Sequence, residues 1–443
     1  MLQLLYFQFH VYDCKHQRVN SFHASTSEDH SSADPTYKTC IVRVSNHATD
    51  GLSTFGRNDY SRRQSFNSNS TLQLVYAMDG FWHVFRTDTN AHVKKLIGPA
   101  ADAEPQWHPT NPEVLYYLPT NGVGMKIYSI NVITGIITTV ADLASRIKTR
   151  WPSANAAWTK SEGSPSKDAR FWCFMVDDSS WNSVGVISYD LVQDQIIGFL
   201  NTNGVRPDHV SASPSGKYCV VSGDDASGTV AHSLDFTQKK KVHTKSEHSD
   251  LAINELGEDI YVSIDYQANG GDVFMTNLKT GQRTNLFPTY IDGSTTALHV
   301  SGKGYNVPGW VVISTYAMSG PRQWLHDKIL LVPLNVSKPI YALAHHRSIS
   351  NGYWTEPHAS VNRDLTMIAF TSNWNVNSAE NVDAYRIEIP SLVASPKNSS
   401  NNTNNGNNTA NSTERSTVRV GSASTSSCIR SFLTLIVCCF LIL

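Results

Sequence analysis

The stretch Leu298-His299-Val300-Ser301, followed by Trp310-Val311-Val312-Ile313-Ser314, places a histidine shortly before a strand-like run of apolar residues. The same pairing occurs three more times along the chain. In those copies the histidine lies in Asp208-His209-Val210-Ser211, Glu247-His248-Ser249-Asp250 and Pro357-His358-Ala359-Ser360. Because equivalent positions of a radially repeated β fold face one axis, we expect the four histidines to lie close together. This arrangement predicts a site for a metal or a polar ligand.

The repeat extends toward the N-terminus. Strand-like runs occupy residues 72–76, 81–85, 114–118 and 171–175, and turn pairs such as Asp79-Gly80 separate runs of this kind. Counting all copies gives seven units of roughly 40 to 55 residues, a period typical of propellers. Helical periodicity is weak, with residues 141–147 as the one short candidate. The sequence therefore predicts an all-β fold, a seven-bladed β-propeller.

Charge and composition narrow the possible partners. The chain has 36 Lys and Arg residues against 37 Asp and Glu residues, for a net charge of −1. Nucleic-acid-binding domains usually carry a marked excess of basic residues. We therefore expect no nucleic acid among the partners, and we expect the protein to be a monomer.

The two ends of the chain differ from the repeats. Residues 1–66 are polar and rich in His and Ser, so we expect a poorly ordered segment with a weak secretory signal at its start and an outer strand at residues 40–44. The propeller is expected over residues 67–393. Residues 394–421 are rich in Asn, Ser and Thr and cannot bury enough apolar surface to offset their ordering entropy, which predicts a disordered stalk.

Residues 422–443 are typical of a signal for a glycosylphosphatidylinositol (GPI) anchor. Small residues around Gly421 and Ser422, a polar spacer and the apolar residues 432–443 match this signal. The apolar run is too short to span a bilayer, which takes about 20 residues. We expect lipid attachment at Gly421 or Ser422 and an extracellular location. Glycosylation sequons begin at Asn69, Asn335, Asn398, Asn401, Asn407 and Asn411.

Cys173 and Cys219 lie in strand-like runs of adjacent repeats. Two interpretations are open: a disulfide between the repeats, or two buried thiols that behave as small apolar residues. We favour the buried thiols. No cysteine spacing in the chain is typical of a zinc site or a redox pair.

The last repeat resembles that of the oligogalacturonate lyases. The resemblance rests on Leu343-Ala344-His345-His346, then Glu356-Pro357-His358-Ala359-Ser360, then the strand-like run at residues 367–373. Leu298-His299-Val300-Ser301 and Glu247-His248 are also similar to family motifs. Members of that family are seven-bladed propellers that hold a divalent metal, typically manganese, and cleave pectin-derived uronides by β-elimination.

The resemblance implies a divalent metal, most simply Mn²⁺, on His299 and His358. Glu356 stands where the family has a further histidine ligand, and Tyr353 stands where it has a glutamine. A carboxylate combined with imidazoles suits Mn²⁺, whereas a phenol is a weaker replacement for an amide oxygen. The implied ligand shell is therefore His299, His358, Glu356 and Tyr353.

We expect four residues to bind the substrate. His209 and His248 match family histidines that line the channel, and His346 is expected to enter the channel as well. Arg322 lies in a loop whose aromatic and basic character is typical of saccharide contact. Each also has an ordinary structural interpretation, as a packed histidine or a rim arginine. An acidic oligosaccharide or cell-wall glycan is the implied partner.

The chain departs from the family at the catalytic base. The family is thought to use an arginine, but the corresponding residues 223–235 contain neither Arg nor Lys. His232 is the one candidate in that segment for removing a proton. Two functions remain open: a cell-surface, metal-dependent lyase for acidic saccharides, and a non-catalytic propeller that binds proteins or glycans.

Overall fold

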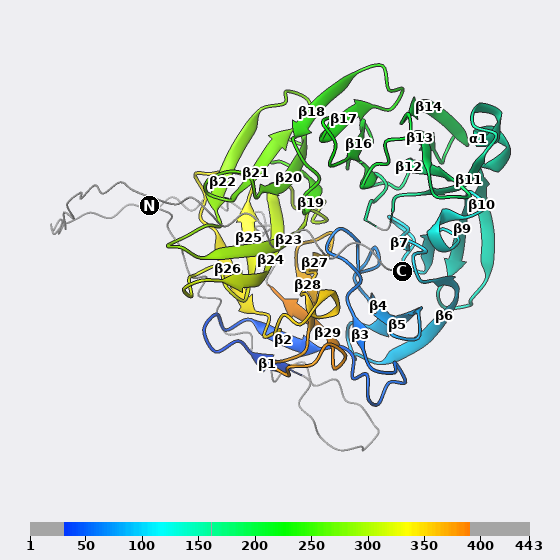
Figure 1. The fold of residues 1–443 in the computed structure, drawn as a ribbon. Helices are drawn as coiled ribbons and strands as arrows, with labels where there is room; N and C mark the ends of the chain where they lie inside the picture. Colours follow the sequence, from blue (N-terminus) through cyan, green and yellow to red (C-terminus); the bar gives the residue numbers. More distant parts are fainter. Residues whose placement is uncertain (1–30, 161, 390–443) are drawn as a thin grey trace, which may run out of the picture. The chain divides into compact units, whose positions relative to one another are not determined.

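The strands of the chain form seven antiparallel sheets, which are the blades of a propeller. In the computed structural model, residues 31–160 and 162–389 are described. Figure 1 shows the sheets arranged as a ring, with β7, β19, β23 and β27 toward its centre. The predicted seven-bladed β-propeller is therefore confirmed.

Six blades contain four strands each, in sequence order. The first two blades comprise β3 (Gly56–Arg57), β4 (Leu72–Ala77), β5 (Phe81–Arg86) and β6 (His92–Ala100), then β7 (Gln106–Trp107), β8 (Val114–Tyr117), β9 (Lys126–Asn131) and β10 (Ile137–Asp142). The third and fourth comprise β11 (Ala154–Trp158), β12 (Phe171–Asp178), β13 (Ser183–Asp190) and β14 (Gln195–Asn201), then β15 (His209–Ala212), β16 (Tyr218–Ser222), β17 (Thr229–Ser233) and β18 (Lys239–His243). The fifth and sixth comprise β19 (Ser249–Ile253), β20 (Asp259–Asp265), β21 (Asp272–Asn277) and β22 (Arg283–Pro288), then β23 (Thr295–Ser301), β24 (Trp310–Ser319), β25 (Lys328–Pro333) and β26 (Tyr341–His345).

The seventh blade closes the ring with strands from both ends of the described chain. It comprises β27 (Ser360–Val361), β28 (Met367–Ser372), β29 (Asp383–Glu388), β2 (Cys40–Arg43) and β1 (Ser31–Ala33). β2 pairs antiparallel with β29, with Ile41 opposite Ile387. The outer strand predicted at residues 40–44 is thus present. The expected boundary at residue 67 is wrong, because β1, β2 and β3 all precede it and belong to the propeller.

The helices of the described residues are few and short. α1 (Ala144–Arg150) overlaps the predicted helical stretch but lies three residues further along the chain, and η1 (Thr120–Gly122) and η2 (Tyr353–Thr355) are single 3-10 turns. Within residues 31–160 and 162–389, no helix is both long enough and apolar enough to cross a bilayer.

The core lies between neighbouring blades, where their apolar faces meet. Val262 on β20 and Val300 on β23 belong to one buried cluster, and Phe370 on β28 packs with Leu331 on β25 in the next. Each strand alternates between these interfaces, because successive side chains of a strand point to opposite faces of the sheet. Stacking blade on blade in this way buries both faces of every sheet.

A disulfide joins the third and fourth blades, which corrects the expectation of two buried thiols. Cys173 on β12 bonds to Cys219 on β16, and their Cα atoms are 5.8 Å apart. These are the second strands of adjacent blades, which pack face to face at a separation typical of disulfides. The sequence indicated that the two cysteines lie in adjacent repeats. It did not show how the strands of the two blades are aligned with each other.

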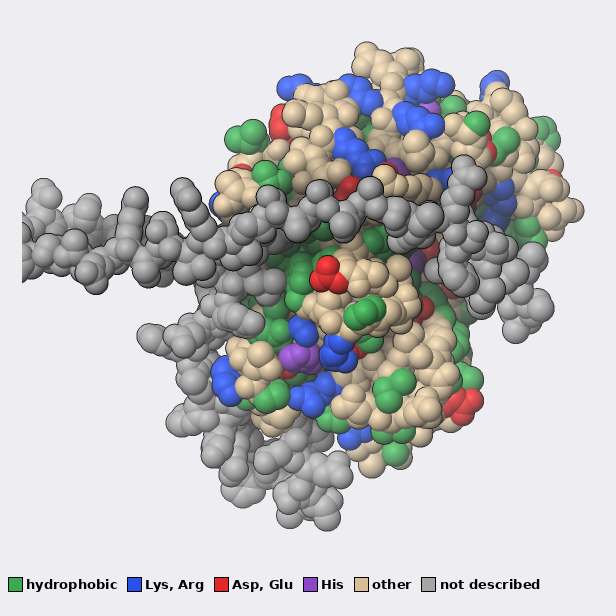
Figure 2. Space-filling model, turned by 60° about the vertical axis from the view of Figure 1, so that its left-hand side comes forward, with side chains coloured by type: hydrophobic (Ala, Val, Ile, Leu, Met, Phe, Trp, Pro, Cys, Tyr) green, Lys and Arg blue, Asp and Glu red, His purple; other side chains and the backbone are tan. Residues whose placement is uncertain are grey.

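The surface carries charges of both signs. On the face drawn in Figure 2, Lys and Arg side chains are spread among Asp, Glu and apolar side chains. This mixture agrees with the net charge of −1. Asn69 is exposed and Asn335 is partly exposed. The other predicted sequons, the stalk and the expected anchor residues Gly421 and Ser422 lie outside the described residues.

Candidate metal centre and the axial strap

A segment between β3 and β4 runs through the middle of the ring, and we call residues 58–67 the axial strap. Figure 1 shows this blue loop inside the circle of blades. Its backbone accepts hydrogen bonds from three different blades. The donors are the Ser164 and Ser360 hydroxyls and the Trp107 indole. The strap therefore forms part of the propeller core, although it lies in the segment expected to be poorly ordered.

His299, Glu356 and His358 form one cluster at the axis, which we call the histidine–glutamate cluster. Each offers a ligand atom, and these atoms lie within 4.8 Å of one another. The Nε2 atoms of His299 and His358 lie 3.4 Å and 3.3 Å from Glu356 Oε2. His299 comes from β23, and Glu356 and His358 come from the loop between η2 and β27. Two adjacent blades thus supply the predicted ligands.

Tyrosine rings enclose this cluster. The Tyr316 ring stacks on His299 at a centroid distance of 4.5 Å, and the Tyr353 ring lies 4.8 Å from His358. Tyr60 of the axial strap contacts both imidazoles, at 5.5 Å and 5.1 Å. His299 and His358 are fully buried as a result. Tyr353, a predicted ligand, lies beside the cluster with its ring against His358.

Burial sets the protonation of the cluster. It lowers the pKa of His299 and of His358 well below 6.5, and nearby positive charge on Arg57 acts in the same direction. Burial also raises the pKa of Glu356 to about 7, although Arg57 opposes this rise. Both imidazoles are therefore neutral at neutral pH, the form in which a histidine can donate a lone pair to a metal.

Arg57 determines which nitrogen of His358 carries the proton. Its Nη1 lies 3.2 Å from His358 Nδ1. A guanidinium can only donate, so His358 Nδ1 accepts and the hydrogen of the neutral ring sits on Nε2. His358 Nε2 faces Glu356. A metal can take this nitrogen only when Arg57 releases Nδ1, because a metal-bound histidine normally donates its other N–H to an acceptor.

The donor set otherwise fits a divalent metal. His299 Nδ1, His299 Nε2 and His358 Nε2 are buried and have no hydrogen-bond partner among the described residues. Buried polar atoms without partners are rare in folded proteins and point to an unaccounted ligand. Two imidazoles with a carboxylate suit Mn²⁺, Zn²⁺ or a similar ion.

His248 lies beside the histidine–glutamate cluster. Its ring is 4.5 Å from that of His299, and its Nδ1 lies 3.2 Å from the Tyr316 hydroxyl oxygen. Burial and the nearby Arg62 charge lower the pKa of His248 to about 4. Three of the four repeated histidines, His248, His299 and His358, therefore converge as the repeat predicted.

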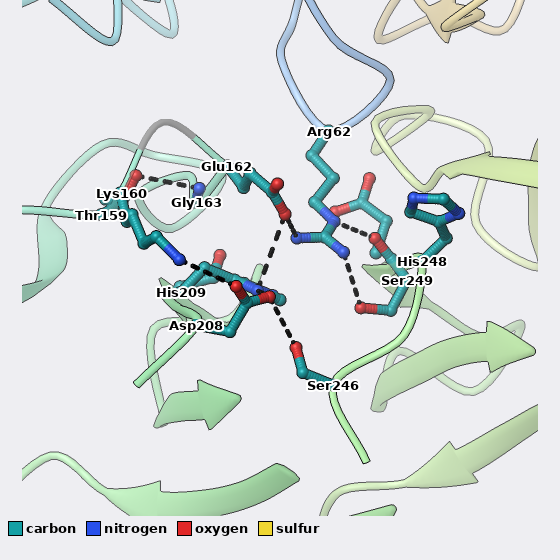
Figure 3. Close-up of polar contacts among 12 residues, drawn as sticks. Arg62, Thr159, Lys160, Glu162, Gly163, Asp208, His209, Ser246, His248 and Ser249 are labelled. Atoms are coloured by element: carbon teal, nitrogen blue, oxygen red, sulfur yellow. Dashed lines mark hydrogen bonds and ion pairs between the residues drawn. The ribbon is translucent and has the colours of Figure 1, made fainter. Parts of the chain in front are cut away.

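His209 belongs to a second cluster, with Glu162 and Asp208. Figure 3 shows this group under the axial strap, with Arg62 reaching between Glu162 and Ser249. Asp208 accepts hydrogen bonds from Lys160 and Ser246, and His209 Nδ1 lies 3.3 Å from Asp208 Oδ2. We call Glu162, Asp208 and His209 the paired cluster, because each member has a charged or hydrogen-bonding partner.

The glycine after Glu162 explains how the loop reaches this position. A Cβ on Gly163 would collide with the Val210 carbonyl oxygen, so the loop can lie against β15 only with glycine there. The Gly163 amide also donates to the Thr159 hydroxyl. This close approach places the Glu162 carboxylate near both Arg62 and His209.

Three other predicted site residues lie away from the histidine–glutamate cluster. His232 lies on β17, the third strand of its blade, where its ring packs against Phe236 at 5.6 Å. His346 is buried after β26, and its Nδ1 accepts from the Ser348 amide. The Arg322 side chain is 70% exposed and pairs with Asp327. The structure thus does not bring His232 to the site, so it supplies no base there.

Sequence reasoning missed Arg57, Tyr60 and Arg62. All three lie in the polar segment before residue 67, which has no apolar periodicity to indicate burial. Their burial depends on the strap passing through the ring, which is a tertiary contact. The adjacent Arg62-Arg63 pair was the one local signal, and it is equally typical of a solvated surface.

Comparison with known proteins supports the fold. No protein-family model and no curated sequence matches the chain. The structure is similar to an oligogalacturonate lyase from Vibrio parahaemolyticus, with 12% identity and a TM-score of 0.57, over 81% of this chain and 96% of that one. It is equally similar to an oligogalacturonate lyase in complex with manganese, with 14% identity, a TM-score of 0.57 and the same coverage. The chain therefore has the propeller fold of oligogalacturonate lyases, as the sequence motifs indicated.

Proposed function

We propose that this protein is a cell-surface propeller that binds a divalent metal at the histidine–glutamate cluster and acts on acidic saccharides. The observation that supports the proposal is the buried cluster of His299, Glu356 and His358, in which three of the four imidazole nitrogens lack a hydrogen-bond partner among the described residues. The similarity in fold to an oligogalacturonate lyase in complex with manganese supports the choice of Mn²⁺ as the metal.

Each residue near the metal has a distinct role in this proposal. His299 and Glu356 hold the ion, and His358 joins them when Arg57 leaves its Nδ1. Tyr316 and Tyr60 fix the orientation of His299 by ring contact. When bound, the metal would neutralise a uronate carboxylate and acidify the adjacent C–H bond. Arg57, once free of His358, is a second positive charge for that carboxylate.

The missing base favours binding without cleavage as the second candidate function. β-Elimination needs a group that removes a proton from the substrate. His232 lies on the outer part of its blade, and Arg62 is engaged with Glu162 and the Ser249 carbonyl. An arginine held in this way remains protonated and cannot accept a proton. A propeller that binds acidic glycans without cleaving them fits these contacts.

Metal analysis tests the metal site, which both candidate functions share. We expect the purified protein to bind about one equivalent of Mn²⁺ or Zn²⁺ in isothermal titration calorimetry, and His299→Ala to lose this binding. Oligogalacturonides are then added to the loaded protein. An unsaturated product that absorbs in the ultraviolet indicates the lyase, and saturable binding without product indicates the binding protein. Absence of stoichiometric metal in the wild type would refute the proposed site.

Cell-surface attachment rests on residues 421–443 of the sequence. With Gly421 or Ser422 as the attachment residue, a phosphatidylinositol-specific phospholipase is expected to release the protein from membranes of a eukaryotic host. Replacing both residues with a bulky residue such as Leu is expected to prevent anchoring. Retention on membranes after phospholipase treatment, with the C-terminal tail still present, would contradict the anchor.

A further inference from the structure

A pocket lies toward the C-terminal end of the axial strap. It is a small hollow, partly open to solvent, formed by the strap and by loops of four blades. The loops follow the first strands β7, β11, β23 and β27, whereas Glu356 and His358 precede β27. Residues before and after one strand lie at its opposite ends. The pocket therefore opens at the end of the ring opposite the histidine–glutamate cluster.

The pocket is rich in hydrogen-bond donors and positive charge. Lys167, Lys303 and Arg363 line it, and none of the described residues that line it is Asp or Glu. Lys303 is buried and neutralised by Asp250, at 2.8 Å between Nζ and Oδ1. Within the described part of the chain, no carboxylate pairs with Lys167 or Arg363. Two positive charges at this pocket are thus not neutralised.

Gln64 of the axial strap adds an unused donor to the pocket. The residue is 9% exposed, and its Nε2 has no hydrogen-bond partner among the described residues. Its Oε1 accepts from the Phe66 amide at 3.2 Å, which fixes the amide with Nε2 as the free end. A buried donor without a partner is costly and points to a missing acceptor.

His108 supplies a further donor. Its Nδ1 accepts from the Thr110 and Asn111 amides at 3.2 Å and 2.9 Å. The neutral ring therefore carries its hydrogen on Nε2. Arg363 is held in place by a hydrogen bond from Nη2 to the Lys167 carbonyl oxygen and by the Tyr305 ring beneath it. Neutral and cationic hydrogen-bond donors thus surround one hollow, and no carboxylate among the described lining residues competes for them.

We propose that this pocket binds a small oxyanion group, a phosphate, sulfate or carboxylate, through Gln64, Lys167 and Arg363. Charge-assisted hydrogen bonds from lysine and arginine to such oxygens are strong, and the Gln64 amide would gain the acceptor that it lacks. The site shares no residue with the histidine–glutamate cluster. It is therefore a separate property of the fold, independent of the proposed metal.

The test uses the whole protein and three probes: inorganic phosphate, sulfate and monomeric galacturonate. Each is titrated by calorimetry at constant ionic strength, with chloride as the reference anion. We expect saturable binding of one probe, and the probe that binds most tightly distinguishes a tetrahedral anion from a sugar carboxylate. Lys167→Ala and Arg363→Ala are each expected to weaken binding by about tenfold.

Two controls separate this site from other effects. Lys217 is exposed in the corresponding loop of the fourth blade but does not line the pocket, so Lys217→Ala should leave binding unchanged. His299→Ala should also bind phosphate and sulfate normally, because His299 does not line the pocket. Galacturonate is compared without added metal, because its carboxylate is also the expected ligand of the proposed metal site. Equal losses in Lys217→Ala and Lys167→Ala, or no saturable binding beyond chloride, would overturn the proposal.

Discussion

The two clusters of histidine and carboxylate at the axis contain similar groups but differ in how those groups are paired. In the paired cluster, Glu162 meets Arg62, and Asp208 meets Lys160 and Ser246. In the histidine–glutamate cluster, the nitrogens of His299 have no hydrogen-bond partner, and Glu356 has no lysine or arginine in direct contact among the described residues. Composition alone does not distinguish the two clusters.

The difference indicates which cluster is structural and which is available for a ligand. A partly buried carboxylate matched by an arginine and by hydrogen bonds is satisfied and stabilises the fold around it. A buried imidazole whose nitrogens lack hydrogen-bond partners has lost its hydrogen bonds to water, and ring contacts do not replace them. We therefore attribute positioning of the axial strap to the paired cluster, and the other cluster is the proposed metal site.

The largest expected effect comes from removing the cation of the paired cluster. Arg62→Met leaves the partly buried Glu162 carboxylate and the buried Ser249 carbonyl without their donor, and losing such charge-assisted hydrogen bonds should cost about 2–4 kcal/mol of unfolding free energy. Urea unfolding followed by tryptophan fluorescence measures the loss. Arg322→Met, at an exposed ion pair, is the matched control and should change stability by about 0.5 kcal/mol or less. Similar losses in both variants would contradict the structural role.

The next effect concerns the histidine–glutamate cluster. His299→Ala removes a proposed metal ligand whose nitrogens have no hydrogen-bond partner among the described residues, so metal affinity should fall by about 100-fold or more. Calorimetric titration with Mn²⁺ measures the affinity. His209→Ala is the control, because its partners are Asp208 and Glu162, and it should bind metal normally. If His209→Ala loses metal instead, the assignment of the two clusters is reversed.

The pH dependence of stability should show that Asp34 is a carboxylate with hydrogen-bonding partners. Asp34 is buried, and although burial favours a higher pKa, hydrogen bonds from the His345 ring and nearby amides hold its pKa well below 3.8. A lowered pKa stabilises the fold above pH about 4, and this contribution disappears as pH falls toward the lowered value. Asp34→Asn should cost about 1–3 kcal/mol at pH 7 and progressively less as pH falls below 4. An Asp34→Asn loss that does not shrink in acid, measured by urea unfolding at several pH values, would contradict the pairing.

The smallest expected effect, on metal affinity, tests the role of Arg57. In Arg57→Gln, the amide oxygen can accept a hydrogen from His358 Nδ1 and leave Nε2 free for a metal, so Mn²⁺ affinity should rise by about tenfold. Nitrogen NMR of the histidine rings reports the tautomer directly. Arg347→Gln removes the same charge from the loop before Glu356 without touching His358, and it should have a smaller effect. A fall in affinity in Arg57→Gln would show that Arg57 helps the metal.

The repeat pattern predicted seven blades and the convergence of four histidines, and three of these four histidines do meet. The reason is that each repeat has the same strand pattern, so His248, His299 and His358 occupy equivalent positions, and ring closure brings equivalent positions together. β2 was also recognisable, because residues 40–44 form a strand on local β-propensity alone. These features follow from periodicity and need no knowledge of contacts between distant residues.

The surroundings of those histidines depend on tertiary contacts alone. Tyr60 and Arg62 reach the axis because the strap is held by blades that are distant in sequence, and Arg57 precedes the strap at the end of β3. Nothing in a polar segment without periodicity encodes that path. The separation of His209 from the other three histidines likewise depends on Arg62 and Glu162 meeting across the ring. The Cys173–Cys219 bond depends on the register between two blades. Ion pairs, histidine tautomers and disulfides depend on the distances between side chains. These distances are fixed only when the ring closes.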